Sequence, residues 1–270
     1  MNSYPQLLSV ANEAVDLAAN LLRSHQPELV TAKGDRDMVT EVDFAIERKV
    51  RRFLADRTPF IGCLGEEEGI SGRMDDLWWS LDPIDGTANF VHGSPLCGVS
   101  LGLLRGGRPV VGVIDLPMLG TRYAAAEGLG AFADGQPIAV RPTTQLSEAI
   151  ISIGDYATGE DAGNRNRLRL SLTGRLADTV QRVRMHGSAA LDLAWLAQGR
   201  TDAVITLSNK PWDVAAGVII AREAGAVLVD KDGSEHATAS AATIGATPEL
   251  VEPILKLVAE AETDVWSRLN

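Results

Sequence analysis

The sequence predicts an α/β (α+β) fold in which an N-terminal antiparallel sheet with two helices is followed by a smaller C-terminal α/β layer. Two observations lead to this prediction. In the first half of the chain, two helical segments precede short apolar runs bounded by Gly and Pro. From about residue 140 onward, strand-like and helix-like segments alternate. We therefore expect an N-terminal subdomain over residues 1–141 and a C-terminal subdomain over residues 142–270.

Two helices are expected near the N-terminus. The first carries an apolar stripe at helical spacing, formed by Leu7, Leu8, Ala11, Val15, Ala18 and Leu22. The second begins at Thr40, because Asp43 stands three residues later and completes a variant of the capping box. Its buried face is expected to comprise Val42, Ala45, Ile46, Phe53 and Leu54.

The remaining elements follow from apolar runs and their punctuation. Strands of the first sheet are expected at residues 60–64, 77–81, 97–104, 109–115 and 123–126. In the second half, strands are expected at residues 149–153, 180–185, 203–207, 226–229 and 243–245. Helices are expected there at residues 165–177, 188–197, 214–224 and 248–269.

The composition is that of a globular protein without a membrane span. Hydrophobic residues make up 45% and charged residues 23% of the chain, and no stretch approaches the roughly 18 apolar residues that a membrane helix requires. A formal net charge of −11 argues against nucleic acid as a partner, because phosphate backbones are bound by clustered Lys and Arg. An acidic protein that binds a phosphate dianion needs an intervening cation, for which a divalent metal is the obvious candidate.

The two cysteines indicate the compartment. Cys63 and Cys97 each lie inside an apolar run, so they are expected to be small buried hydrophobes rather than disulfide partners. The first residues do not show the basic and then apolar pattern of a secretory signal. We therefore expect a cytoplasmic protein.

The segment with the clearest chemical pattern is residues 79–90, where an apolar strand delivers two carboxylates. Asp82 and Asp85 flank a proline that stiffens the turn. Acids so close repel each other unless a cation lies between them, and oxygen ligands suit Mg²⁺, Mn²⁺ or Ca²⁺ better than zinc. Gly86 and Thr87 are expected to open a helix whose free N–H groups bind a phosphate oxygen. The alternative, an Asp-Pro turn followed by an N-cap, explains single residues but not the combination.

Two other acidic segments stand at the ends of expected strands. Glu66 and Glu67 follow the strand at residues 60–64, where a solvated acidic turn is the simpler local interpretation. Asp213 stands at the start of the helix after residues 203–207, where an ordinary N-cap is the alternative. Three small residues, 215–217, would let this helix approach another element closely.

Together these segments resemble the inositol monophosphatase family, a branch of the lithium-sensitive, metal-dependent phosphatases. The resemblance extends from about Lys33 to Gly225. It rests on residues 82–90 (Asp-Pro-Ile-Asp-Gly-Thr-x-Asn-Phe), 212–217, 65–67 and 39–43. It implies a stacked α-β-α-β-α sandwich, a homodimer and inhibition by lithium.

The resemblance also implies the metal ligands. Glu66, Asp82 and the backbone carbonyl of Ile84 would bind a first Mg²⁺, and Asp82, Asp85 and Asp213 a second. Glu66 would help to bind a weaker third ion through waters, and Mn²⁺ is a possible substitute. An acid in the first turn of a helix is the alternative interpretation of Asp43. The resemblance instead implies that Asp43 and Thr87 orient and deprotonate the attacking water, with Glu67 in support. The expected substrate-binding residues are Lys33, Asp85, Gly86, Thr87, Arg184, Gly187, Ser188, Ala189, Thr206 and Asp213.

The expected function is Mg²⁺-dependent hydrolysis of a small phosphomonoester by an activated water, with inositol 1-phosphate as the first candidate substrate. Thr206 stands where many inositol-specific members of the family have an acid, so the alcohol side of the pocket is altered. Histidinol phosphate, fructose 1,6-bisphosphate and 3′-phosphoadenosine phosphates are the alternative substrates. Arg184 precedes the Gly187–Ser188–Ala189 segment, which resembles the family's contact with the alcohol; a surface arginine is the alternative for it.

The sequence gives weaker support to four other functions. Residues 98–102 match the Gly-x-Ser-x-Gly pattern of serine hydrolases, but Ser100 lies inside an apolar run with no helix after it, which favours a strand residue. The four histidines have no zinc-ligand spacing, and no Gly-x-Gly-x-x-Gly follows a strand. A protein-binding relative without catalysis would be free to lose acids, whereas the set in this sequence is complete.

Overall fold

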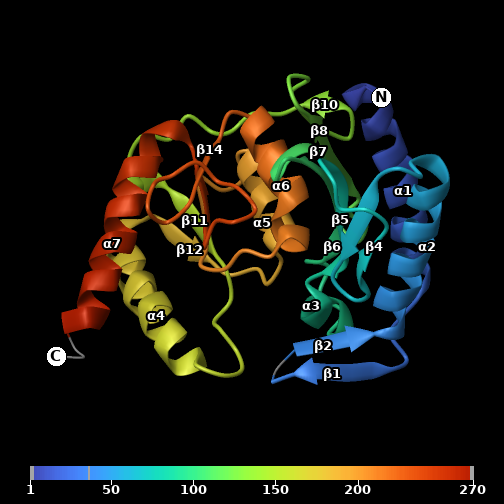
Figure 1. Cartoon of the computed structure of the whole chain (residues 1–270). Helices are drawn as coiled ribbons and strands as arrows, with labels where there is room; N and C mark the ends of the chain where they lie inside the picture. Colours follow the sequence, from blue (N-terminus) through green and yellow to red (C-terminus); the bar gives the residue numbers. More distant parts are fainter. Residues whose placement is uncertain (1–2, 36, 268–270) are drawn as a thin grey trace.

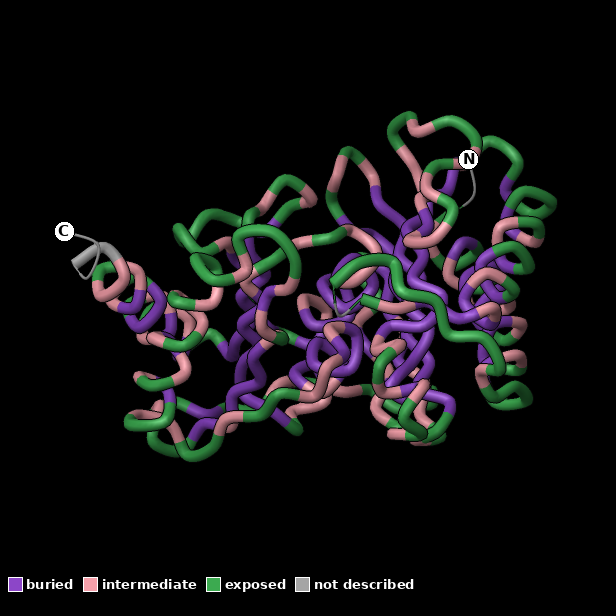
Figure 2. Tube along the Cα trace, turned by 90° about the horizontal axis from the view of Figure 1, so that it is seen from below, coloured by how far each residue is buried: buried purple, intermediate pink, exposed green. Residues whose placement is uncertain are grey.

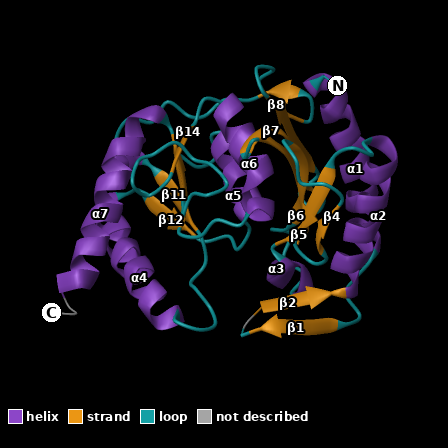
Figure 3. Ribbon diagram, in the orientation of Figure 1, coloured by secondary structure: helices purple, strands orange, loops and turns teal. Residues whose placement is uncertain are grey.

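The helices and sheets stack in five layers (Figure 1), as the family resemblance implies. The computed structural model describes residues 3–35 and 37–267. An outer pair of helices, a large sheet, a central pair of helices, a smaller sheet and a second outer pair follow one another. These three pairs are α1 (Tyr4–Ser24) with α2 (Glu41–Arg57), α5 (Ala189–Ala197) with α6 (Pro211–Glu223), and α4 (Ala162–Thr179) with α7 (Val251–Ser267). Figure 3 shows the two sheets separated by the central pair.

The large sheet has eight strands in the order β10-β9-β8-β7-β6-β5-β3-β4. All neighbours pair antiparallel except β3 and β5, which are parallel. Its strands are β3 (Gly62–Gly65), β4 (Gly69–Ser71), β5 (Leu77–Asp85), β6 (Gly98–Arg105), β7 (Arg108–Leu116), β8 (Thr121–Ala126), β9 (Ala131–Ala133) and β10 (Gln136–Pro137). The short strands β4, β9 and β10 were not predicted, because two or three residues are too few to form an apolar pattern.

The smaller sheet has five strands in the order β12-β11-β13-β15-β14. β12, β11 and β13 run parallel to one another, and β15 pairs antiparallel with β13 and β14. The strands are β11 (Ile150–Ile153), β12 (Arg182–Arg184), β13 (Ala203–Thr206), β14 (Val227–Val229) and β15 (Thr243–Ala246). The expected subdomain boundary at residue 141 falls in the segment between β10 and β11 and stays a prediction.

Helix α6 packs closely against the large sheet because small residues meet on both sides. A Cβ added at Gly112 of β7 would lie 2.5 Å from the Ala216 carbonyl oxygen, and one at Gly102 of β6 would lie 2.8 Å from the Ala215 Cβ. A Cβ at Gly217 would meet Leu193 of α5 at 2.5 Å. The close approach predicted from residues 215–217 is confirmed, and it sets the position of the α6 N-terminus.

The buried face of α2 differs from the prediction. Ala45 is exposed, and Asp43 and Glu47 are buried in its place, on the side that faces the large sheet. The prediction counted apolar residues only, whereas this face is partly polar. The predicted helix start is confirmed, since the Thr40 N–H donates to Asp43 Oδ2 at 2.8 Å in a capping box.

Two other segments depart from the prediction. The strand expected from Phe60 begins at Gly62, because residues 58–61 form a turn closed by the Ile61 N–H and the Thr58 carbonyl; Phe60 itself is 90% exposed. A hairpin of β1 (Val30–Gly34) and β2 (Asp37–Thr40) lies beside the short helix α3 (Thr87–Val91) and was not predicted (Figure 1). Every residue of β1 is exposed, so the strand has no buried side to produce an alternating pattern.

Buried residues are concentrated in the two sheets and in α5 and α6, whereas the outward faces of the outer helices are exposed (Figure 2). Cys63 and Cys97 are buried and unpaired, as predicted. Among the helices within residues 3–35 and 37–267, none combines the length and hydropathy of a membrane span.

Candidate active site

Strand β5 presents Asp82 and Asp85 through a β-bulge. Asp82 lies opposite Ser100 of β6 and Asp85 opposite Gly98, so β5 advances by three residues while β6 advances by two. In a regular strand, side chains three residues apart point to opposite faces, and the extra residue removes this restriction. The Ile84 N–H donates to Asp82 Oδ1 at 3.0 Å and closes the turn.

Three acids from distant parts of the chain meet in one cluster. One carboxylate oxygen from each of Glu66, Asp82 and Asp213 lies within 4.8 Å of the other two. Glu66 follows β3, Asp82 lies in β5, and Asp213 lies in the first turn of α6. Within residues 3–35 and 37–267, this is the only group of three or more acids, histidines or cysteines that lie close enough together to bind a metal ion.

The cluster is rich in negative charge. Burial, together with the charges of Glu66 and Asp85, raises the pKa of Asp82 well above its usual value. Burial also raises the pKa of Asp85 to about 7 and that of Asp213 to about 8, the latter with help from the Asp85 charge. Carboxylates that resist ionisation in this way are stabilised by a bound cation.

The turn that carries Glu66 and Glu67 is supported by Glu47, a residue that sequence analysis missed. The fully buried Glu47 carboxylate accepts the N–H groups of Glu67 and Glu68, both at 2.9 Å, and forms an ion pair with Arg51 at 2.6 Å. Glu47 lies four residues after Asp43 on the same face of α2. That spacing from a suspected site acid is the signal that would have identified it.

Lys33 reaches this turn from the hairpin. Its Nζ donates to Glu66 Oε1 at 3.0 Å and to Glu67 Oε1 at 2.7 Å. Burial opposes protonation of Lys33, but the hydrogen bond to Glu67 and the charge of Glu66 prevail and raise its pKa. Burial raises the pKa of Glu67 to about 7 in spite of Lys33.

Asp43 and Thr87 also lie together. The Thr87 hydroxyl donates to the Ile84 carbonyl at 3.0 Å and to Asp43 Oδ1 at 3.4 Å. The other oxygen of Asp43 accepts the Thr40 N–H at 2.8 Å and the Thr40 hydroxyl at 2.6 Å. Burial raises the pKa of Asp43 against these hydrogen bonds. The hydroxyl is thus placed between the acid and the backbone of the β5 turn.

Asp85 is bound by the start of α5. The Ser188 hydroxyl and the Ala190 N–H both donate to Asp85 Oδ2, the latter at 2.7 Å, and the Ala189 N–H donates to Oδ1 at 3.3 Å. Three of the predicted substrate-binding residues, 187–189, therefore lead into α5 beside a predicted metal ligand. Asp85 is not one of the three acids that share the 4.8 Å cluster, although its charge acts on Asp82 and Asp213.

Gly86 and Asn89 join α3 to the neighbouring loops. Gly86 has φ +87°, and a Cβ there would lie 2.9 Å from the Leu96 carbonyl oxygen and 3.1 Å from that of Gly187. Asn89 Nδ2 donates to the Leu96 carbonyl at 2.8 Å and to the His186 carbonyl at 2.7 Å. The β5–α3 turn is thereby fixed to the segment that leads into α5.

The last two predicted residues differ in placement. Thr206 is buried at the end of β13, next to Gly154. Arg184 is exposed on the edge strand β12, and its Nη1 donates to the neighbouring Val183 carbonyl at 3.0 Å. The structure therefore gives Arg184 the geometry of a surface arginine.

Ser100 is a strand residue, as predicted. It is fully buried within β6, and its hydroxyl donates to the Trp212 carbonyl at 3.3 Å. It does not occupy the strand-to-helix turn on which a nucleophile elbow depends.

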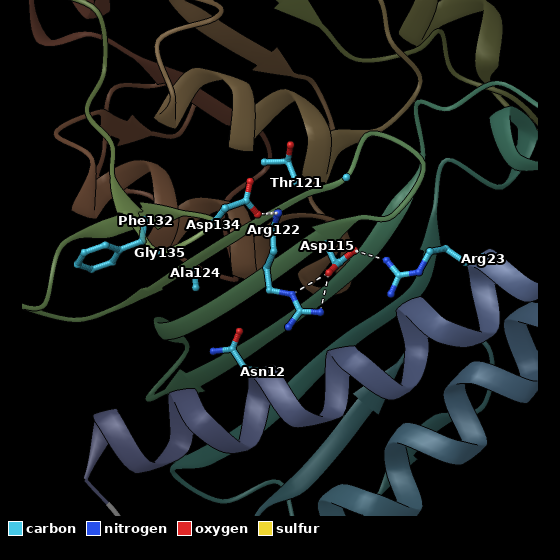
Figure 4. A pocket seen from close by; sticks show the side chains of 10 residues that line it. Asn12, Arg23, Asp115, Thr121, Arg122, Ala124, Phe132, Asp134 and Gly135 are labelled. Atoms are coloured by element: carbon cyan, nitrogen blue, oxygen red, sulfur yellow. Dashed lines mark hydrogen bonds and ion pairs between the residues drawn. The ribbon is translucent and has the colours of Figure 1, made fainter.

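A cavity of about 570 Å³ lies apart from the acidic cluster, between α1 and strands β7 to β9 (Figure 4). Arg122 crosses it and forms an ion pair with Asp115 at 2.6 Å, and Arg23 lies 4.0 Å from the same carboxylate. The cations of this cavity are thus already paired with acids.

Comparisons with known proteins agree with the acidic cluster. The sequence profile of the "Inositol monophosphatase family" matches residues 4–263. The inositol-1-monophosphatase ImpA of Mycolicibacterium smegmatis is 37% identical over 253 residues, which cover 93% of this chain and 91% of the relative. A fructose-1,6-bisphosphatase/inositol-1-monophosphatase of Thermotoga maritima is 35% identical over 241 residues, covering 87% and 88%.

Solved structures show the same fold. The IMPase of Thermotoga maritima superposes with a TM-score of 0.88 at 32% identity, covering 96% of this chain and 99% of the other. The inositol monophosphatase of Anabaena superposes with a TM-score of 0.85 at 31% identity, covering 95% and 96%. With its five-layered fold, its acidic cluster and these matches along nearly its whole length, the chain belongs to the inositol monophosphatase family of phosphatases.

Proposed function

We propose that this member of the family is a Mg²⁺-dependent phosphomonoesterase whose first candidate substrate is inositol 1-phosphate. The observation that carries the proposal is the convergence of Glu66, Asp82 and Asp213 within 4.8 Å. The names of the relatives support the substrate, since the Mycolicibacterium protein is an inositol-1-monophosphatase.

The residues of the cluster fit a magnesium site. All the side-chain donors are carboxylate oxygens, which Mg²⁺ and Mn²⁺ prefer, and the raised pKa values of Asp82 and Asp213 indicate a need for positive charge. In the proposal, Glu66, Asp82, Asp85, Asp213 and the Ile84 carbonyl hold two to three Mg²⁺ ions, with Mn²⁺ as a substitute. Bound Mg²⁺ would supply Lewis-acid activation of water and would neutralise charge on the phosphoryl oxygens.

The residues around the cluster orient the reactants. Asp43 and Thr87 would hold the attacking water and accept its proton, because Thr87 already donates to Asp43 and Thr40 fixes the other Asp43 oxygen. Glu67 would assist from the adjacent turn. The first N–H groups of α3, at Gly86 and Thr87, have no partner within the helix and would bind phosphoryl oxygens.

The alcohol half of the substrate would lie toward α5. Residues Gly187 and Ser188 lead into this helix, Ala189 is its first residue, and Thr206 ends strand β13. We propose that these residues surround the alcohol half of the substrate and that Lys33 contacts the phosphate. Arg184 is the weakest of the proposed contacts, because it is exposed and bonds its own strand.

Fructose 1,6-bisphosphate is the second candidate substrate. The Thermotoga relative, 35% identical to this chain, carries both activities in its name. The acidic cluster and the Asp43–Thr87 pair act on the phosphate, which the two substrates share. Discrimination between the two substrates must therefore come from the residues that contact the alcohol half.

Assembly and location are also part of the proposal. We infer a homodimer in the cytoplasm from the family resemblance and from the two buried, unpaired cysteines, which suit a reducing compartment.

The test is a phosphate-release screen with the purified protein, in Mg²⁺ and in EDTA. Inositol 1-phosphate, fructose 1,6-bisphosphate, histidinol phosphate and 3′-phosphoadenosine 5′-phosphate are compared by kcat/KM. The proposal expects Mg²⁺-dependent release with inositol 1-phosphate as the best substrate. A clear preference for another compound overturns the substrate assignment, and release that persists in EDTA overturns the metal assignment.

A further inference from the structure

Three parallel strands end at one edge of the smaller sheet, and this edge borders the candidate active site. β12, β11 and β13 run in the same direction, so the loops after them meet at their carboxyl ends. Ligands of open α/β sheets bind at such edges. The loop after β12 leads to Ser188, whose hydroxyl donates to Asp85. The loop after β11 carries Asp155.

The Asp155 carboxylate lies beside the turn into α5. A Cβ added at Gly187 would stand 3.5 Å from Asp155 Oδ2 and 3.2 Å from Asn89 Nδ2. The Gly187 carbonyl oxygen in turn would lie 3.1 Å from a Cβ added at Gly86. Asp155 therefore lies one short segment away from the start of α3 and from Ser188.

The backbone of the Asp155 loop is held by several contacts, none of which uses the Asp155 side chain. Arg169 Nε donates to the Asp155 carbonyl at 3.2 Å, and its Nη2 donates to the Leu207 carbonyl at 2.8 Å. The Gly154 N–H donates to the Ile205 carbonyl at 2.9 Å. On the other side, the N–H and carbonyl of residue 157 both bond the Asn166 amide, at 2.6 and 2.9 Å.

The carboxylate itself forms no hydrogen bond or ion pair with any residue in the described ranges, and Asp155 is exposed. Partial desolvation raises the pKa of Asp155 above its usual value. Thr206, the polar residue at the end of the adjacent strand β13, is neutral and buried. An acid that is held in position, accessible and without a partner at the edge of a ligand site is suited to accept hydrogen bonds from a ligand.

We propose that Asp155 is a specificity-determining residue that accepts hydrogen bonds from hydroxyl or ammonium donors on the alcohol half of the substrate. The inference rests on the proposed phosphatase function and deepens it. It assigns the enzyme to phosphomonoesters of alcohols that carry such donors, and it predicts weak discrimination among alcohols that have none.

The experiment compares three substrates in the presence of Mg²⁺. Inositol 1-phosphate offers hydroxyl donors, histidinol phosphate offers an ammonium, and phenyl phosphate offers no donor on its alcohol. In Asp155→Ala, kcat/KM for the preferred donor-bearing substrate is expected to fall about tenfold or more, mainly through KM, since a hydrogen bond to a charged group is lost. For phenyl phosphate it is expected to stay within about twofold, because the reacting phosphate is untouched.

Asp155→Asn separates the two donor types. An amide oxygen still accepts a hydroxyl, so a polyol substrate is expected to retain part of its advantage, whereas an ammonium substrate loses the charge that attracts it. Glu160→Gln, an exposed acid of the same loop, is the matched control and is expected to behave as wild type. Thermal unfolding of Asp155→Ala is expected to match wild type, because the contacts of the loop are made by its backbone.

The inference is overturned if Asp155→Ala lowers kcat/KM equally for all three substrates, or leaves all three unchanged. Where the wild-type protein releases phosphate with Mg²⁺, either of these outcomes refutes the inference alone and leaves the proposed function intact. A wild-type protein that releases no phosphate from any of the three with Mg²⁺ refutes the proposed function, and the inference with it.

Discussion

The buried carboxylate of Glu47 accepts the backbone N–H of Glu67 at 2.9 Å, so helix α2 fixes the turn that carries the first acid of the acidic cluster. The second oxygen of Glu47 accepts the N–H of Glu68, and Arg51 neutralises the charge. A Cβ added at Gly65 would clash with the Glu47 carboxylate, so the turn passes close to this carboxylate. The position of Glu66 thus depends on an acid outside the cluster of Glu66, Asp82 and Asp213.

Replacing Glu47 by Gln is expected to destabilise both the turn and the metal site. One acceptor oxygen becomes an NH₂ that faces a backbone N–H, and Arg51 loses its buried counter-charge. We expect a loss of about 2–4 kcal/mol in unfolding free energy and a loss of about 10–100-fold in Mg²⁺ affinity, the usual effect of residues that support metal ligands.

Urea unfolding and Mg²⁺ titration calorimetry measure the two effects. Arg48→Gln is the control, because it removes the exposed pair of Arg48 with Glu68, which contributes about 0–1 kcal/mol, and an exposed contact with the Phe44 ring, but no contact of Glu47. If Glu47→Gln bound Mg²⁺ as tightly as wild type, the supporting role of Glu47 would be wrong.

Asp82→Asn is expected to abolish turnover while it stabilises the metal-free fold. Asp82 is the acid whose pKa is raised by burial and by four neighbouring carboxylates, so a neutral amide removes repulsion in the absence of metal. With Mg²⁺ the same change removes a ligand, and activity should fall at least about 100-fold.

Phosphate release and thermal melting in EDTA at pH 8 check the two halves of this prediction. Asp75→Asn, which touches only the exposed Arg73 pair, should change neither quantity. Retained activity in Asp82→Asn would remove Asp82 from the site, and a lower melting temperature in EDTA would contradict the electrostatic account.

The predictable parts of the site are those that depend on short-range sequence patterns. The capping box of Thr40 and Asp43 depends on neighbours within one helical turn, and the structure confirms it. The helix after residues 203–207 was also predicted, but it begins at Pro211, so Asp213 lies in its first turn and not at its N-cap. The convergence of Glu66, Asp82 and Asp213 was expected only through the family resemblance, because no local rule joins residues so far apart in the chain.

The residues that were missed act through tertiary contacts. Glu residues are almost never fully buried unless they are paired, and the burial of Glu47 depends on the backbone of the turn that it binds. Asp155 follows a short strand in a polar loop, where an acid is ordinary. Its placement follows from the parallel pairing of β11 with β12 and β13, which the sequence pattern did not specify. The hairpin of β1 and β2 was missed because it buries little of its surface.

Gly112→Ala tests whether sheet packing positions Asp213. The new methyl group would meet the Ala216 carbonyl oxygen at 2.5 Å and Ala216 Cα at 2.9 Å, so the backbone of α6 must move away from β7. We expect a loss of about 1–3 kcal/mol in unfolding free energy, with weaker Mg²⁺ binding because Asp213 lies at the start of the same helix.

Gly174→Ala provides the opposite control. This glycine lies within α4 with no atom within 4 Å of an added Cβ, so alanine should stabilise the protein by about 0.5–1 kcal/mol. Urea unfolding and Mg²⁺ titration of both variants give the comparison. A Gly112→Ala protein with unchanged Mg²⁺ affinity would show that α6 is free to adjust without moving Asp213.

His236 should make the protein sensitive to acid. Burial, followed by the charge of Arg222, lowers the pKa of His236 to about 4, against the opposing effect of Asp230. Its Nε2 lies 2.9 Å from the Thr243 hydroxyl, and its Nδ1 has no partner within the described residues. A lowered folded-state pKa means that the unfolded chain binds the proton first, so stability is lost as the pH falls from about 6.5 through about 4. The loss amounts to at most about 3 kcal/mol.

His236→Gln cannot take up this proton. Between pH 7 and pH 4, the wild-type protein should therefore lose up to that much more unfolding free energy than the variant. Urea unfolding of both proteins at several pH values measures the difference, which also cancels the shared titration of the metal-site carboxylates. Parallel pH profiles would mean that His236 is protonated in the folded protein as readily as in the unfolded chain.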